Sequence, residues 1–229
     1  KTGNLLFRKV KESRWHSAPD DAILSVLQPL FREGAGYNPK RKRGSMSRPR
    51  RKQFRTAYLE LTNVCNRSCS FCPGTRRTPR FMEPGLFQKL ARETAPLAEI
   101  AYLHVMGEAL LHPEFQPMMK TASEAGLMTG LTTNGTLFGH PNAKALFLGC
   151  FRQINVSLHS DVSDPELAQV TGFAKELLDR CPGLYLNLRF WNYGRNGERT
   201  EECFQQINRA LDVECRYPEH EARTALRLK

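Results

Sequence analysis

The chain has 229 residues, 40% of them hydrophobic, and a formal net charge of +11, so it is long enough to bury one sizeable core. It has no apolar run long enough to cross a bilayer, and residues 1–8 lack the apolar core of a secretory signal. Three of its seven cysteines fall within eight positions, which suits thiolates at one metal centre better than disulfides. We therefore expect a cytoplasmic protein without membrane contact.

The positive charge is concentrated in one segment. Nine basic residues and no acidic one lie between Lys40 and Arg55, so the rest of the chain is close to neutral. Gly, Ser and Pro are also frequent in residues 38–55, which is typical of a solvated linker. We interpret this segment as a basic linker in preference to a nucleic-acid-binding arm.

The chain divides into three parts around this linker. Residues 1–37 are expected to form an N-terminal extension with a short amphipathic helix between Asp20 and Glu33, because apolar residues recur there at helical spacing. Residues 56–229 form the core, which is expected to be truncated at its C-terminus. In the core, β-rich runs alternate with helical runs. We expect strands at 57–62, 100–105, 127–132, 153–158 and 184–190, and helices at 84–95, 113–125, 142–148, 165–180 and 201–213.

This alternation predicts an α/β protein. Right-handed crossovers between successive parallel strands curl such units into a partial (βα) TIM-like barrel, here of about five to six parallel strands with outer helices. The carboxyl ends of all strands then lie at one rim. The motifs described next all follow strand ends, so we expect them to meet there.

Cys65, Cys69 and Cys72 form a C-x3-C-x2-C motif in the loop after the first expected strand. An iron–sulfur cube normally takes four thiolates, whereas this loop supplies three. One iron is then open to a small ligand. A structural zinc site is the alternative, but no histidine lies between His16 and His104 to complete it nearby.

The spacing, its place after the first strand and the aromatic Phe71 before the last cysteine resemble the radical S-adenosylmethionine (SAM) superfamily. The resemblance implies that the three cysteines hold a [4Fe–4S] cluster whose open iron binds the methionine part of SAM. It places Phe71 near the adenine. Reductive cleavage of SAM then gives a radical that abstracts hydrogen from a substrate, so the chain is expected to be an oxidoreductase of this class.

Further segments resemble the SAM contacts of that superfamily. Met106, Gly107 and Glu108 stand where related proteins have Gly-Gly-Glu, with Met106 replacing the first glycine. The resemblance implies that Glu108 accepts hydrogen bonds from the SAM ammonium group. Polar residues at later strand ends are expected to contact the SAM carboxylate or ribose, or a substrate: Thr133, Asn134, Ser157, His159 and Arg189.

The sequence around these motifs is similar to members that carry a further cysteine-rich (SPASM-type) domain, which often modify peptides. A peptide or a small molecule is therefore the expected substrate, and the arginines of the cysteine loop suggest an acidic electron donor such as flavodoxin or ferredoxin. Two alternatives stay open. One is a zinc-stabilised nucleic-acid-binding module, and the other is a fragment that binds a cluster without turnover.

Overall fold

The structure is a computed structural model that describes residues 2–7, 18–27, 52–70, 72–158, 162–190 and 197–213. Its elements are, in chain order, β1 (Thr2–Phe7), β2 (Ala18–Leu27), β3 (Phe54–Tyr58), α1 (Pro84–Thr94), β4 (Ala98–Tyr102), η1 (Ala109–Leu111), α2 (Phe115–Glu124), β5 (Thr129–Thr133), η2 (Pro141–Phe147), β6 (Phe151–Leu158), α3 (Asp164–Arg180), β7 (Tyr185–Phe190) and α4 (Gly197–Leu211).

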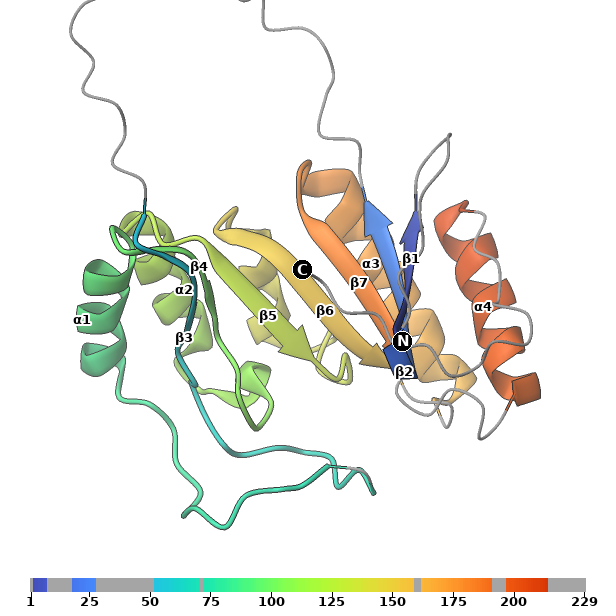
Figure 1. Cartoon of the computed structure of the whole chain (residues 1–229), viewed down its shortest axis with the longest axis horizontal. Coiled ribbons are helices and arrows are strands. Elements are labelled where there is room, and N and C mark those ends of the chain that lie inside the picture. The colour runs from blue at the N-terminus through green and yellow to red at the C-terminus, as the bar shows by residue number, and fades with distance from the viewer. Residues whose placement is uncertain are drawn as a thin grey trace, which may run out of the picture.

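The described strands form one seven-stranded sheet in the order β1-β2-β7-β6-β5-β4-β3 (Figure 1). The five strands from β3 to β7 are parallel, and each pairs with the next along the chain. Because the described sheet is open, with β3 at one edge, the predicted α/β partial barrel is confirmed. The five expected strands and five expected helices are all present, with boundaries shifted by a few residues and η2 adopting the tighter 3-10 form.

The expected helix between Asp20 and Glu33 is wrong over the described part of that range. Ala18–Leu27 is strand β2, which pairs antiparallel with β7, and β1 pairs parallel with β2. The physical reason is tertiary: β7 would otherwise leave a row of backbone N–H and C=O groups unpaired at a sheet edge. Residues 28–33 and most of the linker at 38–55 lie outside the described residues.

Alternate residues of the parallel strands separate an apolar face from a polar one. The helices pack on the apolar face (Figure 1), where the core includes Leu103 of the β4 end, Leu131 of β5 and Val156 of β6. Phe190 of β7 stacks on Phe204 of α4 with ring centroids 5.0 Å apart. This packing fixes the strand ends that carry the predicted site.

Candidate cluster and cofactor site

The cysteines lie on a long loop between β3 and α1, which extends from the sheet on the side to which β5 and β6 point (Figure 1). The base of this loop is closed. The Met82 amide donates to the Leu61 carbonyl at 2.8 Å, and the Thr62 hydroxyl donates to the Arg80 carbonyl at 2.8 Å. We call residues 61–63 and 80–82 the neck of the loop. The neck fixes where the cysteine-bearing segment leaves the sheet.

All three cysteines line one pocket of about 700 Å³, which we call the cysteine pocket. Cys65 and Cys72 are exposed, and Cys69 is half-buried. A turn joins the last two, since the Cys72 amide donates to the Cys69 carbonyl at 3.0 Å. Within the part of the chain that the structure describes, no three Cys, His, Asp or Glu side chains are close enough together to hold a metal ion. The thiols therefore share a pocket wall without meeting at one point.

Gly107 brings the end of β4 against the cysteine loop. Its φ is +77°, and a Cβ there would lie 2.5 Å from the Thr62 carbonyl oxygen and 2.7 Å from that of Val64. The next amide, that of Glu108, donates to the Val64 carbonyl at 2.8 Å. Only glycine permits both the positive φ and this close backbone approach. The residue before the first cysteine is thereby fixed to the rim of the sheet.

Glu108 is 1% exposed, and its carboxylate is engaged by the protein. One oxygen accepts from the Leu110 amide at 3.1 Å, and the other accepts from the Thr133 hydroxyl at 3.0 Å and the Asn134 amide at 2.8 Å. Burial raises the pKa of this carboxyl, while the three donors act in the opposite direction. The side chain thus connects the segment after β4 to the end of β5.

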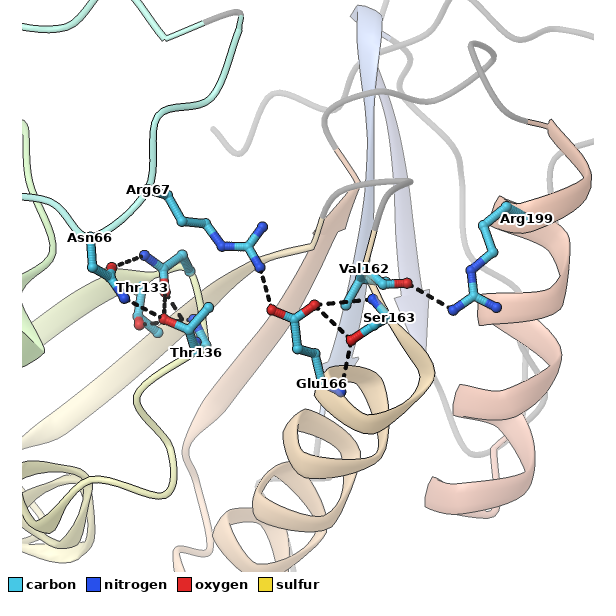
Figure 2. A network of polar contacts seen from close by, with 10 residues as sticks. Asn66, Arg67, Thr133, Thr136, Val162, Ser163, Glu166 and Arg199 are labelled. Atoms are coloured by element: carbon cyan, nitrogen blue, oxygen red, sulfur yellow. Dashed lines mark hydrogen bonds and ion pairs between the residues drawn. The ribbon is translucent and has the colours of Figure 1, made fainter.

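Six of the expected site residues come together at the strand ends, as the parallel sheet predicts. Met106, Gly107, Glu108, Thr133, Asn134 and Ser157 all line the cysteine pocket with the three thiols. Asn66, between the first two cysteines, accepts from the Asn134 side-chain amide at 2.9 Å and donates to the Thr136 hydroxyl at 2.9 Å. Figure 2 shows this contact between the cysteine loop and the end of β5.

A second side chain between the same cysteines reaches a helix. Arg67 donates to Glu166 at 2.7 Å, and the other Glu166 oxygen accepts from the Ser163 amide and hydroxyl at 3.0 Å each (Figure 2). Ser163 and Glu166 form the capping box at the start of α3. These bonds and the Arg67 charge lower the pKa of Glu166. The sequence analysis counted Arg67 among the loop arginines that suggest an acidic electron donor, and it missed this ion pair because the partner is 99 residues away.

The remaining expected site residues are Phe71, His159 and Arg189. Phe71 and His159 lie outside the described residues. Arg189 is on β7 but does not line the cysteine pocket. Its positive charge instead contributes, after burial, to lowering the pKa of His104 to about 4.

Sequence reasoning also missed His104. Its Nδ1 atom accepts from the Thr132 amide at 3.1 Å, and its other ring nitrogen lies 3.0 Å from the Thr132 hydroxyl. The bond to Nδ1 requires that nitrogen to be unprotonated, in agreement with the lowered pKa. Thr132 lines the cysteine pocket, so the neutral imidazole helps to hold the pocket wall. The sequence signal that could have identified His104 is the alternation of polar with apolar residues along β4 to β7.

A sequence model of the radical SAM superfamily matches residues 59–183, more than half of the chain. The chain belongs to the radical SAM superfamily. Enzymes of this superfamily use a [4Fe–4S] cluster and SAM. The expectation of family and cofactors is thereby confirmed.

A curated relative from Pyrococcus furiosus, named as a tungsten-containing aldehyde ferredoxin oxidoreductase cofactor-modifying protein, is 32% identical over 93 residues. The match covers 39% of this radical SAM chain and 26% of the relative, so the chain spans about a quarter of that protein's length. The segment that matches the family model, residues 59–183, includes every predicted site residue except Arg189.

Two solved radical SAM structures are also similar. BtrN in complex with AdoMet and 2-DOIA is 22% identical, with a TM-score of 0.42 over 50% of this chain and 54% of that one. Streptococcus suis SuiB bound to precursor peptide SuiA is 14% identical, with a TM-score of 0.42 over 69% of this chain and 31% of that one. Neither likeness bears on what this chain acts on. No helix among the described residues is long and apolar enough to cross a membrane.

Proposed function

We propose that this chain binds its cluster through Cys65, Cys69 and Cys72 and cleaves SAM reductively to abstract hydrogen from a substrate. One observation carries the proposal: the three thiols line the same pocket as the polar strand ends of β5 and β6. The donor set fits the group, because three thiolates leave one iron of a cube open to SAM. The free thiols also favour a reducing compartment, the cytoplasm.

Residues of this chain position the cysteine loop and the groups that line its pocket. Gly107 fixes the loop to the rim, and Asn66 and Arg67 attach the segment between the first two cysteines to β5 and α3. Thr133, Asn134 and Ser157 line the pocket in which we expect SAM to bind. The Thr133 hydroxyl already donates to Glu108 and accepts from the Gly135 amide, so Thr133 shapes the pocket wall. When bound, the cluster supplies the electron for the cleavage of SAM. We assign Glu108 to holding Thr133 and Asn134 in place, since its oxygens already accept three bonds. Phe71, His159 and Arg189 stay predicted contacts.

Different observations favour two different classes of substrate. The sequence resemblance to SPASM-associated enzymes favours a peptide. The name of the P. furiosus relative favours a small organic cofactor. Both require an external electron donor, for which we propose an acidic protein such as flavodoxin or ferredoxin.

The test is anaerobic reconstitution followed by incubation with SAM and dithionite. We expect bound iron and sulfide, and 5′-deoxyadenosine as a product detected by liquid chromatography and mass spectrometry. Cys69→Ala should abolish the product. Cys181→Ala is the matched control, because Cys181 is a half-buried thiol at the end of α3, outside the loop.

The same samples separate the alternatives. Zinc in place of iron, at one ion per chain, would support the zinc-stabilised module and contradict the proposal. A full iron–sulfur content without 5′-deoxyadenosine in the wild type would support a cluster-binding fragment. Product formation by Cys69→Ala equal to that of the wild type would overturn the ligand assignment.

A further inference from the structure

The neck of the cysteine loop presents a second pocket, distinct from the cysteine pocket. It has a volume of about 480 Å³ and is lined by residues that include Leu61, Arg77, Arg80, Phe81, Met82 and Leu86. Asn63 lines both pockets, so the two adjoin at the neck. We call this second pocket the neck pocket.

The neck pocket combines a rigid base with exposed apolar side chains. The backbone around it is fixed by the Asn63 side chain, which accepts from the Arg80 amide at 2.8 Å and donates to the Thr78 carbonyl at 3.0 Å. Phe81 is 36% exposed and Leu86 is 49% exposed. Exposed apolar groups beside a formed pocket are typical of a surface that a partner covers.

The neck pocket is lined by two arginines, Arg77 and Arg80, and by one carboxylate, Glu60. Residues 61–82 contain four arginines and no Asp or Glu. Arg67 pairs with Glu166, and Arg77 pairs with Glu60. Arg76 and Arg80 form no ion pair with any residue that the structure describes. The positive charge of these two side chains is therefore available to a partner.

We propose that the neck pocket is the docking site of an acidic electron-donor protein. An apolar side chain of the donor enters the pocket beside Phe81 and Leu86, and its carboxylates face Arg76 and Arg80. The inference rests on the proposed function, because it requires a cluster in the adjoining loop. A cluster held by Cys65, Cys69 and Cys72 would accept one electron from the reduced donor, so the donor would be oxidised by one electron and the cluster reduced by one.

The test compares charge-reversal variants of the reconstituted full chain, with a bacterial flavodoxin as the probe. Affinity is measured by isothermal titration calorimetry at low ionic strength, and cluster reduction is followed by stopped-flow absorbance. Arg76→Glu combined with Arg80→Glu should weaken binding and slow reduction by at least about tenfold, with the difference shrinking as salt is added. Reduction by dithionite, which needs no docking, should be unchanged.

The matched control makes the same change of charge elsewhere. Lys144→Glu combined with Lys175→Glu alters exposed lysines on η2 and α3, and it should change affinity less than about twofold. Leu86→Ser should weaken binding with the salt dependence retained, since it removes only apolar contact.

Several outcomes would contradict the proposal that a donor docks at the neck pocket. They are an unchanged affinity and reduction rate in the Arg76/Arg80 variant, an equal loss in the lysine control, or no flavodoxin binding by the wild type. Binding of single-stranded RNA that the arginine variant abolishes, without flavodoxin binding, would also overturn it. These readouts need neither SAM nor product, so failure of SAM cleavage with dithionite counts against the proposed function alone.

Discussion

Individual side chains on the polar face of the sheet form a continuous set of contacts. The Tyr102 hydroxyl donates to Gln153 at 3.0 Å, and Asn155 accepts from both Gln153 and Asn187. Gly130 leaves room for the Tyr102 ring, because a Cβ there would lie 2.5 Å from it. Specific hydrogen bonds therefore hold this face together, whereas apolar packing holds the opposite face. Among the described residues of this face is His104, whose pKa is lowered to about 4.

His104 makes stability depend on pH. Its pKa falls from 6.5 to about 4, through burial first and the Arg189 charge second. The unfolded chain therefore binds more protons between these values, so stability is full above pH 6.5 and is lost as the pH falls towards 4. The free energy of unfolding should fall by about 3 kcal/mol across this range. Urea unfolding across this range, compared between wild type and His104→Asn, measures it as a shallower slope in the variant.

The control for this prediction is His140→Asn, which changes an exposed histidine and keeps a residue suited to the start of η2. Its pH slope should match that of the wild type. The groups that face His104 are Tyr58, Tyr102 and Arg189, and burial raises the pKa of Tyr102, away from this window. Equal slopes in the wild type and His104→Asn would contradict the prediction.

At the scale of elements, the start of α3 is attached to both neighbours. Arg67 connects it to the cysteine loop, and Arg199 of α4 donates to the Val162 carbonyl at 2.8 Å (Figure 2). Arg199 also pairs with Asp164 at 2.6 Å. The Arg67 side chain is 22% exposed, so this pair is screened less than a fully exposed one. The loop's position consequently depends on a helix more than 90 residues later in the chain.

Arg67→Met should loosen the cysteine loop without unfolding α3. Loss of a partly exposed ion pair is worth about 1 kcal/mol, which corresponds to about fivefold faster amide hydrogen exchange for the peptide spanning the cysteines. Arg180→Met, which removes an ion pair within α3, should leave that exchange unchanged. If both variants or neither accelerated exchange in the loop, the attachment would be of no consequence. Charge exchange in Arg67→Glu/Glu166→Arg should restore part of the protection.

For the molecule as a whole, the exposed cysteine loop and the packed sheet differ in what holds them. The sheet and helices share one apolar core, whereas the loop is held by its neck, Gly107 and the contacts of Asn66 and Arg67. Ligands that bind only the folded chain raise its stability. A cluster held by the three thiols of the loop should do so by linking parts of the loop to one another.

We therefore expect reconstitution to raise the thermal midpoint by at least about 4 °C, equivalent to ~2 kcal/mol. Anaerobic differential scanning calorimetry before and after reconstitution measures this. Removal of iron with a chelator should reverse the rise. The triple variant Cys65→Ser/Cys69→Ser/Cys72→Ser should show no rise under the same treatment, and a rise as large as that of the wild type would show that iron binds elsewhere.

Local sequence determined much of this protein. The cysteine spacing identified the family, because three thiols in one short loop carry their chemistry without reference to the fold. The alternation of β-rich and helical runs indicated the βα units, with helices expected to start at 84 and 165 and found to start at Pro84 and Asp164. Parallel strands bring their carboxyl ends to one edge, so the meeting of Gly107, Asn134 and Ser157 followed from that alternation.

Tertiary structure alone decided the rest. Strand β2 forms because β7 offers a pairing edge, which no local pattern in residues 18–27 encodes. Glu108 became an internal acceptor and Arg67 an attachment to α3 because their partners come from strands and helices far along the chain. Long-range hydrogen bonds and burial depend on the folded backbone, and the sequence reports only which side chains are able to make them.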